Sequence, residues 1–309
     1  MLGSALALKL IQGGHDVRIL VHRTRHPRLE GLGLETAQGD LLDPPSLERA
    51  MEGCSTCFHT AGLVSYARAD DDNLYRVNVL GTRNVLKAAR NAGIERLIHT
   101  SSTAAVGASD SPERILDETS PFHPQWERVP YMGTKRLAED AVRAAVISGL
   151  EAVIVNPSTI YGNGDINQNT SRVIHSVKEG KLAAVPSGGS GWVGLDDVVL
   201  GHLLAAEKGR SAERYILSSE NLNHFETLNR MALAVGGRGP RWTLPSVWAG
   251  PVLAAAWGLS LIRSRAAFSP AFARVAFRYR YFSSAKAHLE LGWNPRQTLE
   301  EAVAQALAS

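Results

Sequence analysis

Apolar and polar positions along the chain change repeatedly between the period of a helix and the period of a strand. Residues 2–12 carry Leu6, Leu10 and Ile11 on one side, which predicts a helix, and residues 15–21 then alternate as a strand does. Further strands are predicted at residues 34–38, 56–60, 96–100, 152–155 and 214–217, and further helices at residues 45–51, 72–92, 129–147, 171–179 and up to residue 208.

Strands that alternate with helices indicate βαβ units, and therefore an α/β protein built on a Rossmann-like, doubly wound parallel sheet. In such a sheet, ligands bind beyond the carboxyl ends of the strands. Three segments fall at predicted strand ends, namely Ala61-Gly62, Ser101-Ser102 and Asn156-Pro157. We therefore expect one ligand site at this edge of the sheet.

Two segments are predicted to lack regular structure. Residues 110–128 are polar and contain prolines, which is typical of a surface loop, here lying over the site. The glycines at 188, 189 and 191 indicate a flexible turn.

Composition limits the classes of function. The chain has 309 residues, of which 44% are hydrophobic and 20% are charged, as in ordinary soluble globular proteins. A net charge of +3 is too small to indicate a nucleic-acid partner. Cys54 and Cys57 cannot form a disulfide framework, and a structural role in a reducing cytoplasm is expected. No signal peptide is visible, and no metal site is expected.

The segment that suggests chemistry is Tyr131-Met-Gly-Thr-Lys135, together with Ser101-Ser102-Thr103 upstream. In a helix, Tyr131 and Lys135 lie on one face, one turn apart. A nearby ammonium favours the phenolate, so the pKa of Tyr131 should fall from about 10 towards working pH. A general acid/base acting on an alcohol or ketone needs such a group. Alone, this spacing more often belongs to a solvated helix face.

Taken together, the motifs resemble the extended branch of the short-chain dehydrogenase/reductase family, in the superfamily of NAD-dependent epimerases and dehydratases. The nearest subgroup is similar to dihydroflavonol reductases and 3β-hydroxysteroid dehydrogenases, with hopanoid-associated sugar epimerases close by. The resemblance runs from Leu2-Gly3 to Arg296. The motifs that carry it, besides Ser102, Tyr131 and Lys135, are Gly39-Asp40-Leu41, His59-Thr60-Ala61-Gly62, Asn78-x-x-Gly81-Thr82, Asn156-Pro157-Ser158 and Leu291-Gly292-Trp293-Asn294-Pro295-Arg296.

The resemblance implies a role for each matching residue. Tyr131 would be the catalytic acid/base, Lys135 would lower its pKa and hold the nicotinamide ribose, and Ser102 would bind the substrate oxygen. Asn78 would either take part in this site or bond backbone across the sheet. The residues expected to contact the dinucleotide are Gly3, His22, Arg23, Asp40, Leu41, Ala61, Gly62, Ser101, Tyr131, Lys135, Pro157 and Ser158.

The resemblance also implies a division of the chain into two regions. Residues 1–156 and 191–220 would form the dinucleotide-binding domain. Residues 157–190 and 221–309 would form a smaller, mostly helical substrate-binding region.

The opening of the chain departs from the family pattern. The family begins with a strand and a Gly-x-x-Gly-x-x-Gly turn that places pyrophosphate on a helix N-terminus. Only the last of these glycines, Gly3, is present, so the first strand is expected to be missing. A start codon placed too far downstream or a truncated form would explain this pattern, and weak cofactor binding would follow.

The choice between NADP and NAD depends on the residues after the second strand of the family pattern. An acid there is typical of NAD, whereas a basic residue accommodates a 2′-phosphate. Here Val21 is followed by His22 and Arg23, with no acid. NADP is therefore the expected cofactor, with NAD as the alternative if these basic residues are only a solvated loop.

Residues 243–262 carry no charge and are followed by Arg263, Arg265, Arg274, Arg278 and Arg280. Prolines and glycines inside the uncharged segment favour a broken helix over a substrate pocket or in the core. Contact with a membrane interface and a true membrane span are the alternatives. Each of these interpretations predicts an apolar ligand or apolar surroundings.

The leading hypothesis is an NAD(P)-dependent reductase or dehydrogenase acting on a moderately apolar small molecule. A nucleotide-sugar epimerase or dehydratase with bound NAD would use the same Tyr and Lys without net redox change. A non-catalytic protein that only binds the cofactor is a third hypothesis. A homodimer through the helix that carries Tyr131 is a further expectation.

Overall fold

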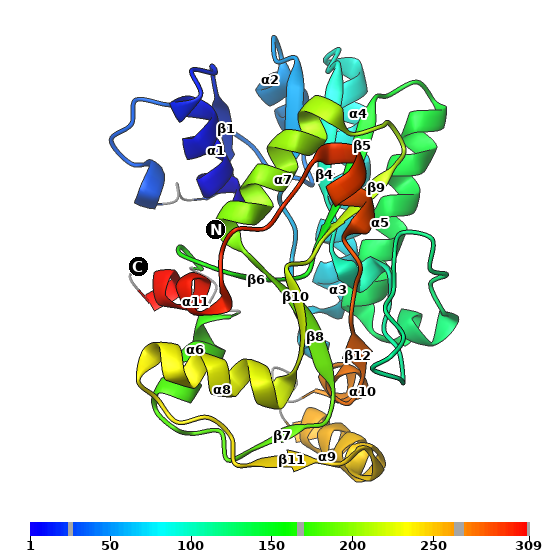
Figure 1. The fold of residues 1–309 in the computed structure, drawn as a ribbon. Helices are drawn as coiled ribbons and strands as arrows, with labels where there is room; N and C mark the ends of the chain where they lie inside the picture. The colour runs from blue at the N-terminus through cyan, green and yellow to red at the C-terminus, as the bar shows by residue number, and fades with distance from the viewer. Residues whose placement is uncertain (24–26, 166–169, 263–268, 308–309) are drawn as a thin grey trace.

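The computed structural model describes residues 1–23, 27–165, 170–262 and 269–307. Six strands that pair only in parallel form two sheets in the upper part of the fold (Figure 1). The larger sheet has the order β3-β4-β5-β9, and β1 pairs with β2 in the other. Among the described residues, no hydrogen-bonded ladder joins β1 to β3. The strands of these two sheets are β1 (Arg18–Val21), β2 (Glu35–Gln38), β3 (Thr56–His59), β4 (Arg96–Thr100), β5 (Ala152–Pro157) and β9 (Arg214–Leu217).

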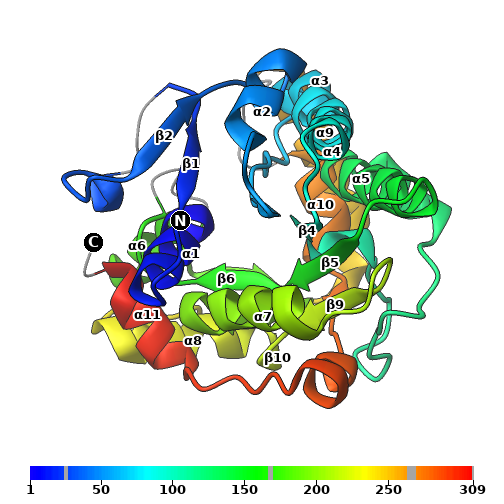
Figure 2. The same ribbon diagram turned by 90° about the horizontal axis from the view of Figure 1, so that it is seen from above.

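Helices cover both faces of the larger sheet, which confirms the predicted doubly wound α/β architecture (Figure 2). α1 (Leu2–Gln12) packs against α7 (Leu195–Lys208) on one face. On the other face, α4 packs between α2 and α5. These three helices are α2 (Pro44–Met51), α4 (Gly81–Asn91) and α5 (Pro130–Ile147).

The long helix predicted at residues 72–92 contains a change of pitch. It begins as α3 (Asp71–Leu74), continues as a π-helical segment (Tyr75–Leu80) and ends as α4. Wider turns of this kind occur often at functional sites. Here the segment carries Asn78, which the structure places beside the candidate site.

The prediction of a flexible turn at residues 188–191 is wrong, because Gly189–Gly194 forms strand β8. These glycines allow close packing within a sheet. A Cβ on Gly189 would lie 2.5 Å from the Tyr281 hydroxyl, and one on Gly191 would lie 2.4 Å from Ser218 Oγ. Glycine inside a strand marks such close approaches, and sequence pattern alone does not separate them from turns.

The rest of the chain combines helices with short strands below the parallel sheet (Figure 1). β8 pairs with β6, β10 and β12, and β7 pairs with β11. The strands are β6 (Thr159–Tyr161), β7 (Ala184–Pro186), β10 (Glu220–Asn223), β11 (Trp242–Leu244) and β12 (Tyr279–Arg280). The helices are α6 (Ser171–Lys178), α8 (His224–Val235), α9 (Ala249–Ile262), α10 (Pro270–Ala276) and α11 (Leu299–Leu307).

Separate apolar cores support the two parts. One core joins α1 and α7 to the parallel sheet, with Trp293 fully buried in it. Another lies under α8 and α11 and contains Trp192 and Met231. The predicted boundary between a dinucleotide-binding and a substrate-binding region stays a prediction. None of the helices in the described part of the chain combines the length and the apolarity needed to cross a bilayer.

Three buried histidines lie at or beside the carboxyl ends of β3 and β4. Burial lowers the pKa of His59 to about 3, that of His202 to about 4, and that of His99 well below its ordinary 6.5. His59 and His202 each bond a threonine hydroxyl, at 3.1 and 2.8 Å. Neither ring nitrogen of His99 has a hydrogen-bond partner among the described residues. All three rings are therefore neutral in the folded protein at pH 7.

We expect acid to destabilise the protein well before carboxylates are protonated. Below about pH 6.5 the unfolded chain takes up protons at these histidines while the folded chain does not, so stability falls by about 1.4 kcal/mol per pH unit for each proton. Urea unfolding at about pH 7.5 and about pH 5.5 measures this slope. His99→Leu should flatten this slope, and it removes no side-chain hydrogen bond to any residue that the structure describes. Equal stability at both pH values would contradict the prediction.

Candidate functional site

The site forms around the start of α5, which begins at Pro130, a favoured first residue of a helix. Tyr131 and Lys135 project from this helix one turn apart, and both are buried. The Tyr131 phenol is hydrogen-bonded to Ser102, which follows β4. Lys135 Nζ donates to the carbonyl oxygen of Thr100 at 3.0 Å. The three predicted catalytic residues thus come together at the carboxyl end of β4.

The electrostatics of Tyr131 differ from the prediction. Burial raises the pKa of the phenol above its ordinary 10, and this effect outweighs the hydrogen bond to Ser102 and the positive charge of Arg280, both of which lower it. The expected fall in the pKa is therefore not found. Burial removes water from around the phenolate, and this destabilises the phenolate more than Ser102 and Arg280 stabilise it.

Burial also dominates at Lys135. It lowers the pKa of the amine to about 8, and the Glu139 carboxylate, one turn further along α5, opposes this fall. The amine lies close to the backbone beyond β3, since a Cβ on Gly62 would be 3.3 Å from Nζ. Lys135 therefore stands between the ends of two neighbouring strands, where a ligand at the sheet edge would meet it.

Asn78 fixes the loop that follows β3. Its side-chain oxygen accepts from the amide of Leu63 at 2.8 Å, and its amide donates to the Leu63 carbonyl at 3.0 Å and to Thr134 Oγ1 at 3.3 Å. Two of these bonds go to backbone, as one of the two predicted roles of Asn78 requires, but the backbone is that of the loop after β3 and not of a strand across the sheet. Asn78 instead ties the segment after Ala61 and Gly62 to the helix that carries Tyr131.

Two further predicted residues, Pro157 and Ser158, end β5 and follow it in the same region, and both are buried. The Ser158 amide donates to Leu217, while its hydroxyl has no hydrogen-bond partner among the described residues. An unpaired buried hydroxyl is costly and is often satisfied by a ligand or water. Ser158 thus fits a residue that meets a bound molecule.

The residues predicted to contact the adenosine part of the cofactor lie at the ends of β1 and β2. His22 Nε2 is 3.1 Å from Asp40 Oδ2, and both side chains are about half exposed. Asp40 also accepts the amide of Leu42 at 2.9 Å, and Leu41 packs against Gly81. Arg23 is exposed. The structure therefore places an acid beside His22 that the linear order of residues did not suggest.

Gly3 and Ser101 have close contacts within the protein. A Cβ on Gly3 would lie 2.8 Å from Thr60 Oγ1, so close packing against β3 already requires glycine there. The Ser101 hydroxyl donates to Glu139 Oε1 at 2.7 Å. Their roles towards a cofactor stay predictions.

Sequence reasoning missed Glu139, whose side chain is fully buried behind the site. Its Oε1 accepts from Ser101 and from Asn156 Nδ2, and Asn156 also donates to the Ser102 carbonyl at 2.9 Å. Its Oε2 pairs with Arg143 at 3.1 Å and Arg214 at 3.3 Å. The carboxylate therefore holds the Ser101-Ser102 segment in place. The spacing of Tyr131, Lys135 and Glu139 at every fourth residue was the available signal.

Arg280 was also missed, because it comes from β12, far along the chain from Tyr131. Its charge lowers the pKa of Tyr131, and its Nε is buried without a partner among the described residues. Apolar groups complete the surroundings. The Tyr66 ring packs edge-on against Tyr131 at 5.7 Å and against Phe272 of α10 at 6.1 Å.

A family model described as "NAD dependent epimerase/dehydratase family" matches residues 1–218 of the chain. The chain belongs to this family. A putative dihydroflavonol 4-reductase of Synechocystis is 34% identical over 99% of the chain and 90% of the relative. Sterol demethylase protein B of Methylococcus capsulatus is 36% identical over 79% of the chain and 74% of the relative. The crystal structure of gox2253 matches with a TM-score of 0.88 and 34% identity over 100% and 94% of the two chains.

The residues of this family member fit a nicotinamide dinucleotide at the sheet edge. Gly62 leaves room beside the Lys135 amine, and the buried Ser158 hydroxyl is unpaired among the described groups. Ser102 and Tyr131 lie at the same strand ends. Lys135, Gly62 and Ser158 are therefore the residues that would hold the cofactor, which supplies or accepts hydride when bound.

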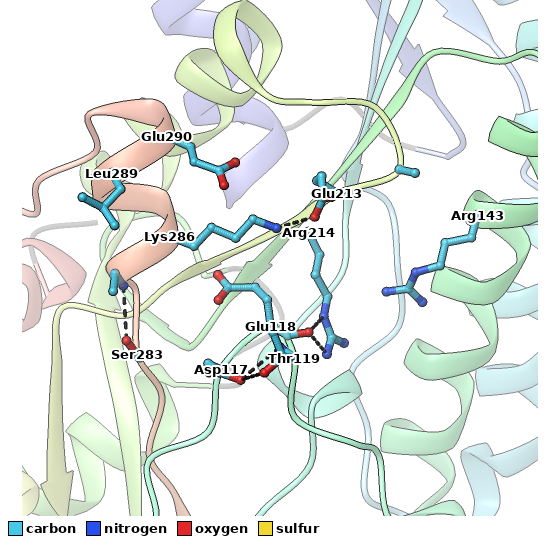
Figure 3. Close-up of a pocket in the computed structure, with 12 residues that line it drawn as sticks. Asp117, Glu118, Thr119, Arg143, Glu213, Arg214, Ser283, Lys286, Leu289 and Glu290 are labelled. Carbon is cyan, nitrogen blue, oxygen red and sulfur yellow. Dashed lines mark hydrogen bonds and ion pairs between the residues drawn. The ribbon is translucent and has the colours of Figure 1, made fainter.

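A pocket of about 520 Å³ lies away from the candidate site of this protein (Figure 3). It does not contain Ser102, Tyr131 or Lys135. Side chains of both charges line it. Lys286 pairs with Glu213 there, and the Arg214 guanidinium donates to the Glu118 carbonyl at 2.6 and 2.9 Å. Because Arg214 and Arg143 also bind Glu139, this pocket borders the network that supports the site from behind.

Proposed function

We propose that this protein is an NADP-dependent reductase or dehydrogenase that interconverts a ketone and an alcohol on a moderately apolar small molecule. The observation that carries the proposal is the buried Tyr131 phenol, hydrogen-bonded to Ser102 with Lys135 one turn away. A phenol, a hydroxyl and an amine at one strand end form a set suited to moving one proton to or from a substrate oxygen.

In reduction, a bound reduced nicotinamide would supply hydride to the carbonyl carbon, and the protein would supply the proton that the carbonyl oxygen takes up. Ser102 would hold the carbonyl oxygen, and Tyr131 would donate its phenolic proton to that oxygen. The raised pKa keeps the phenol protonated at neutral pH, so it is ready to act as an acid. Arg280 and Ser102 would then stabilise the phenolate that remains, before solvent returns a proton.

Apolar side chains around Tyr131 support an apolar substrate. The cluster that contains Tyr131 also holds Trp126 and Val275, with Leu63 and Phe122 packed against it. Two relatives carry names with related chemistry, a putative dihydroflavonol 4-reductase and a 2-alkyl-3-oxoalkanoate reductase. We infer a ketone attached to an aromatic or aliphatic body.

Turnover tests the proposal. The purified protein is incubated with NADPH or NADH and a set of aromatic, alkyl and steroid ketones, and the loss of reduced nicotinamide is followed. Consumption that depends on the ketone supports a reductase. Conversion of a nucleotide sugar without net change in the nicotinamide would support an epimerase instead, and cofactor binding without any turnover would support a non-catalytic role.

We expect NADPH to bind about ten- to thirtyfold more tightly than NADH, because His22 and Arg23 each give the 2′-phosphate a partly exposed charge contact of about 1 kcal/mol. Added salt should narrow the difference. Titration of each cofactor against intrinsic fluorescence measures it. Replacing His22 and Arg23 with Ala should remove most of the preference.

The acid beside His22 provides a matched variant. Asp40→Asn keeps an acceptor for the Leu42 amide but removes a negative charge that lies 3.1 Å from His22. It should therefore strengthen NADPH binding more than NADH binding. Equal affinities for the two cofactors in the unmodified protein at low salt would show that the basic residues only face solvent.

A further inference from the structure

β11 and α9 lie at one end of the molecule (Figure 1). These two elements and the turn Ser246–Trp248 between them carry large apolar side chains that are exposed. We refer to these side chains as the β11–α9 face. Its members and their exposed fractions are Trp242 at 69%, Val247 at 78%, Trp248 at 53%, Trp257 at 46%, Leu261 at 75% and Ile262 at 83%.

α9 has the composition of a buried helix but is not buried. Its sequence from Ala249 to Ile262 contains no charged residue, yet only Ala256 and Ser260 are buried. A helix that is apolar on all sides normally lies in a core or in a bilayer. With 14 residues, α9 is shorter than the roughly 20 residues needed to cross the hydrocarbon of a membrane. Because α9 is neither buried in a core nor long enough to cross a bilayer, an interface between water and an apolar phase is the environment that suits it.

The type of side chain supports a lipid interface. Trp is enriched where hydrocarbon meets lipid headgroups, because its ring is apolar and its N–H is polar. Of the six Trp residues in the chain, Trp126, Trp192 and Trp293 are buried. The other three all belong to the β11–α9 face.

The stretch of sequence that contains this face carries charge of one sign. Between Glu226 and Glu290 the sequence contains no Asp or Glu, but it contains Arg230, Arg238, Arg241, Arg263, Arg265, Arg274, Arg278, Arg280 and Lys286. Some of these cations are used inside the protein, since Arg230, Arg278 and Lys286 pair with carboxylates from other segments.

Cations next to the face are available for an outside partner. Arg238 and Arg241 are exposed and form no ion pair with any residue that the structure describes. Arg68 lies over the Trp257 ring at 5.9 Å. Arg263 and Arg265 follow Ile262 directly in the sequence and lie outside the described residues. Clustered cations beside an exposed apolar helix match an anionic lipid surface, on which each cation adds to binding.

We propose that the β11–α9 face docks on the surface of an anionic lipid bilayer, with Trp248, Leu261 and Ile262 entering the headgroup region. α9 packs against α10, and α10 supplies Phe272 beside Tyr66, which in turn contacts Tyr131. Docking would therefore bring the apolar side of the candidate site close to the lipid. The inference goes beyond the proposed function, and its test uses neither cofactor nor substrate.

Vesicle binding tests the proposal. The protein is mixed with vesicles of phosphatidylcholine alone, or of roughly equal amounts of phosphatidylcholine and phosphatidylglycerol. Co-sedimentation and the Trp emission spectrum are measured. We expect binding to the anionic vesicles with a shift of emission to shorter wavelength, at least about tenfold weaker binding to the neutral ones, and release by about 0.5 M salt.

Matched variants identify the surface. The double variant Leu261→Glu, Ile262→Glu should weaken binding to anionic vesicles at least about tenfold, because two exposed apolar side chains are replaced by charges of the wrong sign. Ile147→Glu changes an equally exposed residue, 89% accessible, at the far end of α5 and should leave binding unchanged. Thermal melts check that both variants are folded.

Three outcomes would overturn the proposal. They are failure to bind anionic vesicles, equal binding of the unmodified protein and the double variant, and equal binding to neutral and anionic vesicles. Sedimentation velocity without lipid examines another occupant of the face. If the unmodified protein does not bind vesicles but self-associates, and the double variant does not self-associate, the face would be assigned to a second copy of this chain.

Discussion

Replacing Tyr131 with Phe is expected to lower kcat by about 10²- to 10⁴-fold, because a positioned general acid supplies about that factor. The ring remains, so the packing against Tyr66 and the buried cluster around Tyr131 are preserved. The phenol acts on the proton and not on the dinucleotide, so the affinity for cofactor should change by no more than a few fold. Single-turnover rates and cofactor titrations on the same preparation measure both quantities.

A second tyrosine offers a control for the loss of a buried hydroxyl. Tyr215 is fully buried on β9, and its hydroxyl donates to Glu290 at 2.9 Å, outside the candidate site. Tyr215→Phe should therefore lower stability modestly while leaving kcat per folded molecule unchanged. Substantial activity in a purified Tyr131→Phe protein would exclude Tyr131 as the acid.

Local patterns in the sequence were sufficient to predict the elements that build the site. The predicted helix at residues 129–147 corresponds to α5 (Pro130–Ile147), and the strand at residues 96–100 corresponds to β4. These elements have a clear period and clear ends, so their bounds follow from nearby residues. Because parallel strands end at the same edge of a sheet, Ser102, Tyr131 and Lys135 could be placed together from the sequence alone.

Features that depend on contacts between distant segments could not be predicted in this way. The glycines of β8 looked like a turn, because the Tyr281 hydroxyl that requires Gly189 comes from elsewhere in the chain. The pKa of Tyr131 could not be predicted either, since burial outweighs the nearby charges and depends on the whole fold. The exposure of α9 is a third case, because its apolar composition favoured a core or pocket helix.

Glu139 shows how a buried charge can be detected only after the fold is known. Its carboxylate receives hydrogen bonds from Ser101 and Asn156 on one side and ion pairs from Arg143 and Arg214 on the other. Arg214 is itself only 7% exposed at its side chain. Removal of Glu139 would leave this guanidinium buried with its charge uncompensated, although the Glu118 carbonyl still accepts from it.

We therefore expect Glu139→Ala to lower the free energy of unfolding by about 3–5 kcal/mol, the usual cost of breaking one side of a buried ion pair. Glu139→Gln should cost less, because its amide oxygen can still accept from Ser101. Urea unfolding curves give both values. Asp140→Asn is the matched control, since Asp140 is the next residue of α5 and pairs with Arg143 from a half-exposed position.

Glu139→Gln should also move a pH profile, which a purely structural role would not do. The Glu139 carboxylate raises the pKa of Lys135, against the burial that lowers it to about 8. Without that charge the pKa of Lys135 falls further, so the amine loses its proton at a lower pH. If the Lys135 ammonium holds the cofactor ribose, the pH above which cofactor affinity declines should shift downward in Glu139→Gln and stay in place in Asp140→Asn. An unchanged profile in folded Glu139→Gln would show that Glu139 supports the fold without acting on Lys135.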